Sequence, residues 1–268
     1  MSVGILAAAF WLAVGVPAFT QQGESPAKGT GIPGPSVSPE GTPSTPSQTA
    51  RLSNEDRADI FMARKSYHDA LDYYQRALKD KTNQNPRIWN KIGIARQNLQ
   101  ELSEARRAYK EAIRLRKDFS EPYNNIGTTY YLNDQAKKSL KWYRQAIERD
   151  PSNPAYHYNL GTALYATKRF KEAIESYQRV LDLDSNFFTS RSNVGTTLQA
   201  RPADAKYFFY IAKVFAHNNR FEEAVRYLRR ALEDGFKDFE MIDQDPDFKI
   251  MAEFPPYVEL RATPPKSL

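Results

Sequence analysis

Small and large apolar positions recur along the chain at a constant interval. Four octets share the pattern, with evenly spaced glycines at 93, 127, 161 and 195: NKIGIARQ (90–97), NNIGTTYY (124–131), YNLGTALY (158–165) and SNVGTTLQ (192–199). After each of the first three glycines, a small residue, an aromatic and a second small or β-branched residue follow at +12, +16 and +19. This spacing puts the three on one helical stripe. Each unit is therefore predicted to be two antiparallel helices that bury their faces only by stacking on neighbouring units.

The pattern divides the chain into segments. We expect regular repeats at 51–85, 86–119, 120–153 and 154–187, an irregular half-repeat at 188–204, a further unit at 205–235 and a cap at 236–268. After Gly195 the pattern breaks, because Tyr207 stands where a small residue is due. Ala212, which takes the glycine position of the next unit, follows Gly195 by only half a period. Either one helix is missing or 188–204 is an irregular junction; its Ser, Thr, Asn and Gly content favours the junction.

The motifs identify a family. Trp89-x2-Ile92-Gly93 is followed by Ala105-x3-Tyr109-x2-Ala112; Tyr123-x2-Ile126-Gly127-x2-Tyr130 is followed by Ser139-x3-Tyr143-x2-Ala146; and His157-x2-Leu160-Gly161-x2-Leu164 is followed by Ala173-x3-Tyr177. Several copies in phase resemble the tetratricopeptide repeat family. The resemblance implies an all-α superhelix of about five helix-turn-helix repeats, one irregular, with a C-terminal helical cap. Arg96 departs from the family pattern, because a large apolar residue is usual there.

The resemblance also implies a binding surface. Such arrays usually bind peptides or proteins along the concave face, which the first helix of each pair lines. The residue two before each glycine is Lys91, Asn125, Asn159 or Asn193, and a column of amides resembles the asparagine ladders that hold a peptide backbone in some members of the family. Neighbouring candidates on this face are Asn124, Thr128, Tyr131, Tyr158, Thr162 and Tyr165. The alternative is that the amides only bond across to the next helix, and we expect at least a third of the neighbouring candidates to be buried.

Other chemistry finds little support in the sequence. The clamp for acidic chaperone tails, known in this family, needs a lysine where Glu55 stands. Asp243, Asp245 and Asp247 begin like a calcium loop, but Phe248 takes the place of the required glycine. No pattern of a nucleophile, phosphate loop or metal-ligand pair stands out, so we expect no enzyme activity, no cofactor and no metal. The predicted function is a protein-interaction scaffold whose partner is a protein or peptide.

The C-terminal segment leaves the repeat pattern at Gly235, which suits the end of a helix. Its apolar residues are spaced to cover the exposed end of an open array: Phe236, Phe239, Ile242, Phe248, Met251, Phe254 and Tyr257. The same aromatics could instead dock a partner. In that alternative the protein is a structural or assembly subunit of an envelope complex, with its outer face and C-terminal segment as contacts.

The N-terminal segment bears on location. Residues 3–16, VGILAAAFWLAVGV, are an uncharged apolar run, and Ala18 closes a small-residue pattern typical of signal-peptide cleavage. Residues 1–20 are therefore expected to be a signal peptide, or an anchor if uncleaved, in an exported, periplasmic or secreted protein. Residues 21–50 hold six Pro, five Gly, five Ser and four Thr, so a disordered tether is expected there.

Composition changes this picture little. A net charge of +6 over 268 residues is too modest to indicate a nucleic-acid partner. The absence of cysteine excludes disulfides, thiol chemistry and a lipid anchor on cysteine.

Overall fold

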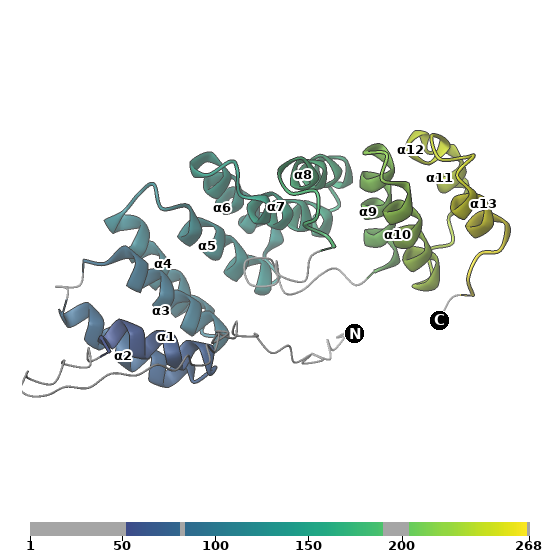
Figure 1. Cartoon of the computed structure of the whole chain (residues 1–268). Coiled ribbons are helices and arrows are strands. Elements are labelled where there is room, and N and C mark those ends of the chain that lie inside the picture. The colour runs from purple at the N-terminus through teal and green to yellow at the C-terminus, as the bar shows by residue number, and fades with distance from the viewer. Residues whose placement is uncertain (1–51, 81–83, 190–203, 267–268) are drawn as a thin grey trace, which may run out of the picture. The chain divides into compact units, whose positions relative to one another are not determined.

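The computed structural model describes residues 52–80, 84–189 and 204–266 (Figure 1). The chain divides into two units, residues 1–49 and 50–268, and all described residues belong to the second. Within them the protein is helical and has no strand, which confirms the prediction of an all-α repeat array. The paired helices are α1 (Asn54–Ala63) with α2 (Tyr67–Asp80), α3 (Pro86–Asn98) with α4 (Leu102–Leu115), α5 (Ser120–Leu132) with α6 (Ala136–Arg149), α7 (Pro154–Ala166) with α8 (Phe170–Leu183), and α9 (Ala205–His217) with α10 (Phe221–Glu233). Three short helices follow: α11 (Phe239–Gln244), α12 (Pro246–Lys249) and α13 (Pro255–Ala262).

The first helices α1, α3, α7 and α9 start at polar caps, whereas α5 follows Phe119, which makes no side-chain cap bond. Ser53 and Asp56 form a capping box at α1, in which each side chain bonds the backbone of the other. Asn85 and Asn153 each stand before a proline, and their side chains accept backbone N–H bonds at the starts of α3 and α7. Asp204 accepts the amide of Tyr207 at 2.7 Å at the start of α9. Side-chain acceptors of this kind satisfy N–H groups that the helix itself leaves unpaired.

The turn inside each pair has one geometry. A residue with positive φ, between 55° and 62°, follows the first helix of every pair: Lys65, Gln100, Asp134, Lys168 and Asn219. The next residue then bonds back to the helix, as Gln135 N does to Tyr130 O at 2.9 Å and Arg169 N to Leu164 O at 2.9 Å. These left-handed turns end the first helix and reverse the chain.

The repeated glycine has a steric cause. A Cβ at Gly93, Gly127 or Gly161 would lie 2.3, 2.7 or 2.6 Å from a ring carbon of the tyrosine in the second helix of the same pair. The tyrosines concerned, Tyr109, Tyr143 and Tyr177, are completely buried. The first helix therefore lies directly on a ring, and glycine is what permits the close approach. Each such ring adds about 1.5–3 kcal/mol by its burial.

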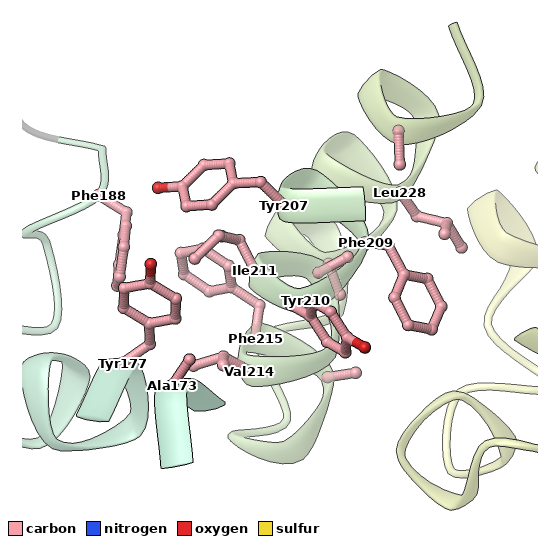
Figure 2. Packing of buried hydrophobic residues seen from close by; sticks show 14 of the residues in the cluster. Ala173, Tyr177, Phe188, Tyr207, Phe209, Tyr210, Ile211, Val214, Phe215 and Leu228 are labelled. Atoms are coloured by element: carbon pink, nitrogen blue, oxygen red, sulfur yellow. The ribbon is translucent and has the colours of Figure 1, made fainter. Parts of the chain in front are cut away.

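Helix α9 packs on the last regular pair mainly through aromatic rings. Tyr177 of α8 lies 6.0 Å from Tyr207 and 6.0 Å from Phe188, measured between ring centroids. Figure 2 shows Tyr177 and Phe188 facing Ile211 and Phe215 of α9. Gly195, Asn193 and most of the expected junction at 188–204 lie outside the described residues.

The C-terminal helices cap the array. Phe209 of α9 stacks on Phe236 at 4.5 Å and lies 5.5 Å from Phe248, between centroids. Lys213 Nζ binds Asp245 at 2.6 Å and Asp247 at 3.2 Å, which fastens α9 to α12. The cap aromatics thus belong to the core, and the expectation of a cap is confirmed. The aspartates that begin like a calcium loop include this lysine's partners.

Candidate functional site

The candidate site consists of side chains from α3, α5 and α7, the first helices of three successive pairs. A chain of amide hydrogen bonds joins these helices. Asn159 Nδ2 donates to Asn124 Oδ1 at 2.8 Å, Asn124 Nδ2 to Asn125 Oδ1 at 3.3 Å, and Asn125 Nδ2 to Asn90 Oδ1 at 3.1 Å. Asn90 in turn donates to Glu121 Oε2 at 3.2 Å. The two predicted ladder asparagines that the structure describes, Asn125 and Asn159, therefore bond across the repeat boundary to Asn90 and Asn124, each one position before the ladder position of the preceding pair.

Burial divides this amide chain into two parts. The side chain of Asn159 is fully buried and that of Asn124 is 4% exposed, whereas Asn125 is partly exposed. Buried amides must find partners inside the protein, and each such bond stabilises the fold by about 0.5–1.5 kcal/mol. Asn124 and Asn159 thus hold neighbouring repeats together, and Asn125, which bonds both Asn90 and Asn124, is the member of the chain that keeps some exposure.

Lys91, the first ladder position, lies in a charged cluster. Its Nζ binds Asp59 at 2.6 Å and Glu55 at 3.2 Å, and the Tyr74 hydroxyl donates to Asp59 at 2.6 Å. Burial alone would lower the pKa of Lys91, but the hydrogen bonds to the two carboxylates outweigh it and raise the pKa. The lysine is a fixed cation that ties α3 to α1.

The threonines next to the ladder anchor the core tyrosines. The Tyr143 hydroxyl donates to Thr128 Oγ1 at 3.3 Å, and the Tyr177 hydroxyl to Thr162 Oγ1 at 3.3 Å. Thr128 is partly exposed, whereas Thr162 is fully buried. Of this pair, only Thr128 offers a side chain to a ligand.

Helix α9 and its cap contact two buried tyrosines of α7, Tyr158 and Tyr165. The Tyr158 hydroxyl lies 3.4 Å from that of Tyr207, and the Tyr165 hydroxyl donates to Asp204, the cap of α9. Tyr158 is 3% exposed and Tyr165 is 8% exposed. Tyr131 of α5 remains partly exposed, and burial, together with Tyr158, Asp134 and Asp204, raises its pKa to about 12.

The accessible part of the predicted surface is therefore smaller than the sequence suggested. It comprises Lys91, Asn125, Thr128 and Tyr131. Of the six neighbouring candidates four are buried, namely Asn124, Tyr158, Thr162 and Tyr165, which agrees with the expectation of at least a third. Asn193 lies outside the described residues. Sequence reasoning missed Asn90, although it lies next to Lys91 and holds the position of Asn124 in the preceding repeat.

The described ranges lack two kinds of feature. In residues 52–80, 84–189 and 204–266, no group of three or more His, Cys, Asp or Glu side chains could hold a metal ion. Over the same residues no helix has the length and apolar character needed to cross a lipid bilayer.

Comparison with known families agrees with the geometry. A family model for the tetratricopeptide repeat matches residues 55–118, 90–154, 124–186 and 190–238. The chain belongs to the tetratricopeptide repeat (TPR) family. TPR arrays are protein–protein interaction scaffolds and are typically non-catalytic, and this chain has that fold. The match at 190–238 includes the segment around Gly195 and the α9–α10 pair.

Several solved TPR structures are similar in fold. A crystal structure of MamA is 19% identical and has a TM-score of 0.48, over 67% of this chain and 94% of that one. MamA from Desulfovibrio magneticus RS-1, from residue 41 to its end, gives 19% identity and 0.48 over 67% and 92%. YrrB, a TPR protein with an unusual peptide-binding site, gives 16% and 0.45 over 78% and 91%. Similarity at this level says nothing about a shared ligand. No curated protein sequence matches the chain.

Proposed function

We propose that this TPR array binds an extended peptide or protein segment across Lys91, Asn125, Thr128 and Tyr131, and that it does so in the cell envelope. One observation supports the binding surface above all: these side chains, partly exposed and able to hydrogen-bond, come from successive first helices. The buried Asn124–Asn159 bond fixes the spacing of α5 and α7. A preformed surface of donors and acceptors lowers the entropic cost of holding a peptide backbone.

Site-specific photocrosslinking in native cells tests this proposal. A photoreactive residue at Thr128 should capture one partner that a photoreactive residue at Arg144, exposed on α6, does not capture. With the partner purified, the double variant Asn125→Ala, Tyr131→Phe should bind about tenfold more weakly. Arg144→Ala is the matched control. Unchanged affinity in the double variant, with its helical content intact, would exclude this surface.

The envelope location rests on the sequence of residues 1–20, which lie outside the described residues. The apolar run 3–16 and the small residues up to Ala18 support cleavage and export. N-terminal sequencing of the mature protein, combined with cell fractionation, tests this. Cleavage near Ala18 supports export, and an intact Met1 in the membrane fraction supports an anchor. An intact Met1 in the cytosol would contradict both.

The alternative role as an assembly subunit finds less support, because the C-terminal aromatics pack mainly into the protein's own core. Phe236, Phe248 and Tyr257 are buried, and Phe239 and Phe254 pack against the same core. Removing 236–268 would expose this core, so loss of a complex after such a deletion would not reveal a docking site.

A further inference from the structure

A pocket of about 650 Å³ opens between α2, α3 and α4, away from the proposed peptide surface. Its apolar lining includes Leu78, Trp89, Ile92 and Ala108. Leu78, Ile92 and Ala108 are nearly fully buried, so they form a floor. The volume falls within the range of about 300–1,000 Å³ that is typical of ligand pockets.

The pocket coincides with a position that other repeats fill with an aromatic ring. The residue equivalent to Ala108 is Tyr73 in the first pair, Trp142 in the third and Tyr227 in the last. Each of these rings packs on an aromatic of the preceding helix, with centroids 5.3 Å apart for Phe61–Tyr73, 6.2 Å for Tyr123–Trp142 and 6.4 Å for Phe208–Tyr227. At Ala108 the protein's own sequence supplies a methyl group where a ring would fit.

A second departure from the repeat pattern also lines the pocket, at Arg96. Three positions after the repeat glycine, the third, fourth and last pairs carry Tyr130, Leu164 and Phe215, whereas α3 carries Arg96. The Arg96 guanidinium donates to Glu101 Oε2 at 2.6 Å, at the start of α4. The fourth pair also has a small residue, Ser176, at the position of Ala108, but it keeps the buried Leu164. Among the described pairs, α3–α4 alone combines a small residue with a charged one.

The rim of the pocket is basic. Lys79 and Arg107 are exposed there, and neither takes part in an ion pair of the described residues. Glu111, also on the rim, is already bound by Arg114 at 2.8 Å, which leaves Glu104 to oppose the two cations. The excess of one positive charge favours an anionic group beside whatever fills the pocket.

We propose that this pocket receives an aromatic side chain of a partner protein, with an aspartate or glutamate next to it in the partner's sequence. The ring would pack between Trp89 and Ala108 as Trp142 packs against Tyr123, and the carboxylate would face Arg107 and Lys79. Buried aromatic anchors are the usual source of binding energy at such sites. The surface shares no residue with Lys91, Asn125, Thr128 and Tyr131, so the two sites can be tested independently.

Three capped peptides serve as probes for the full chain: one tryptophan flanked by acidic residues, the same tryptophan flanked by lysines, and an alanine flanked by acidic residues. Binding is followed by NMR at the indole N–H of Trp89, assigned with Trp89→Phe. The acidic tryptophan peptide should shift this signal, and the other two should bind about tenfold more weakly or not at all. Equal binding of the lysine peptide would overturn the acidic partner, and no shift with any peptide would overturn the pocket.

Variants locate the binding site. Ala108→Trp fills the pocket as Trp142 does in the next repeat, so it should abolish binding while the melting temperature holds or rises. Arg107→Glu should weaken the acidic peptide about tenfold. Lys141→Glu, at the equivalent exposed position of α6, is the matched control and should leave binding unchanged. If Ala108→Trp does not fold, Arg96→Tyr restores the residue type of Tyr130 and serves the same purpose. Full binding by a folded, filled variant would refute the proposal.

Discussion

Asn159→Ala is the change that most directly separates the structural role of the amide chain from a role in binding. Asn159 is fully buried, and its Nδ2 donates to Asn124 Oδ1 at 2.8 Å, joining α7 to α5. The substitution removes this donor and leaves the Asn124 oxygen inside the protein, where that side chain is only 4% exposed. We therefore expect a loss of stability and not merely a loss of affinity.

The magnitude follows from the burial of the acceptor. A buried polar group deprived of its partner costs about 1–3 kcal/mol, with about 2 kcal/mol as the central value. Alanine is the better helix former and returns about 0.5 kcal/mol. The net loss is then about 1.5 kcal/mol, which for an array of this size lowers the melting temperature by about 3–6 °C.

The assay is thermal and urea unfolding followed by circular dichroism. Asn98→Ala is the matched control: Asn98 is exposed at the end of α3 and its amide bonds Ile94 O of the same helix, so water replaces the lost bond and stability should change by about 0.5 kcal/mol or less. Asn124→Ala and the Asn124→Ala, Asn159→Ala double variant complete a cycle. Because the two side chains share one bond, the double variant should lose less stability than the sum of the single variants, by about 0.5–3 kcal/mol.

The reasoning fails if Asn159→Ala unfolds at the wild-type temperature, or if Asn98→Ala costs as much as Asn159→Ala. Either result would mean that the amides do not join the repeats as the structure indicates. Strict additivity of Asn124→Ala and Asn159→Ala would count against their direct hydrogen bond.

The packing supports three other predictions. Gly127→Ala places a Cβ 2.7 Å from the buried ring of Tyr143. The overpacking of about 1–3 kcal/mol should exceed the gain of about 1 kcal/mol in helix propensity, so the free energy of unfolding should fall. A variant that is more stable than wild type in urea would contradict this. The pKa of Tyr131 is raised to about 12, so its contribution to stability is complete below pH 10, the pKa of an unperturbed tyrosine, and is lost as the pH rises toward 12. Ultraviolet absorbance of the phenolates near pH 12 should be smaller by one tyrosine in Tyr131→Phe than in wild type, because Tyr156, whose pKa is also raised to about 12, titrates in both. Lys213→Ala removes the bond to Asp245 and should destabilise the C-terminal cap by about 1–3 kcal/mol. Hydrogen exchange in α12 should then be faster than in wild type while exchange in the repeats stays the same, and unchanged exchange in α12 would argue against a stabilising role of this ion pair.

The candidate site was only partly predictable from the sequence. The period placed Asn125 and Asn159 on equivalent positions, but their accessibility differs, and α9 covers the neighbouring candidates Tyr158 and Tyr165 of α7. Tyr158 and Tyr165 are buried by contacts with Tyr207 and Asp204, which stand more than one full repeat later in the chain. Contacts over such distances leave no signal in the pattern of a single repeat.

The residues that leave the pocket at Ala108 open could be recognised from the sequence more easily than the burial of the asparagines. Alanine in the place of Trp142, and Arg96 in the place of Tyr130, are visible once the repeats are aligned. Arg96 stood out as a departure from the family pattern, but the sequence does not reveal whether neighbouring side chains fill the space that a large apolar residue would occupy there. The arrangement of α2, α3 and α4 decides that, because Leu78 of one repeat and Ala108 of the next must be placed before an empty volume can be recognised.

The sequence by itself determined the repeat, the family and the helices. The reason is local: the glycine of the first helix and the tyrosine of the second meet within one helical pair, as Gly161 and Tyr177 do, and the pairs with Gly93 and Gly127 repeat the same contact. The tertiary structure alone decided which polar residues face inward. Whether an asparagine side chain can bind a ligand or instead hydrogen-bonds to the next repeat depends on what packs over it. Asn159 is buried and bonded to Asn124, whereas Asn125 remains partly exposed, and the stacking of the repeats makes that difference because the two side chains stand at equivalent positions of the sequence.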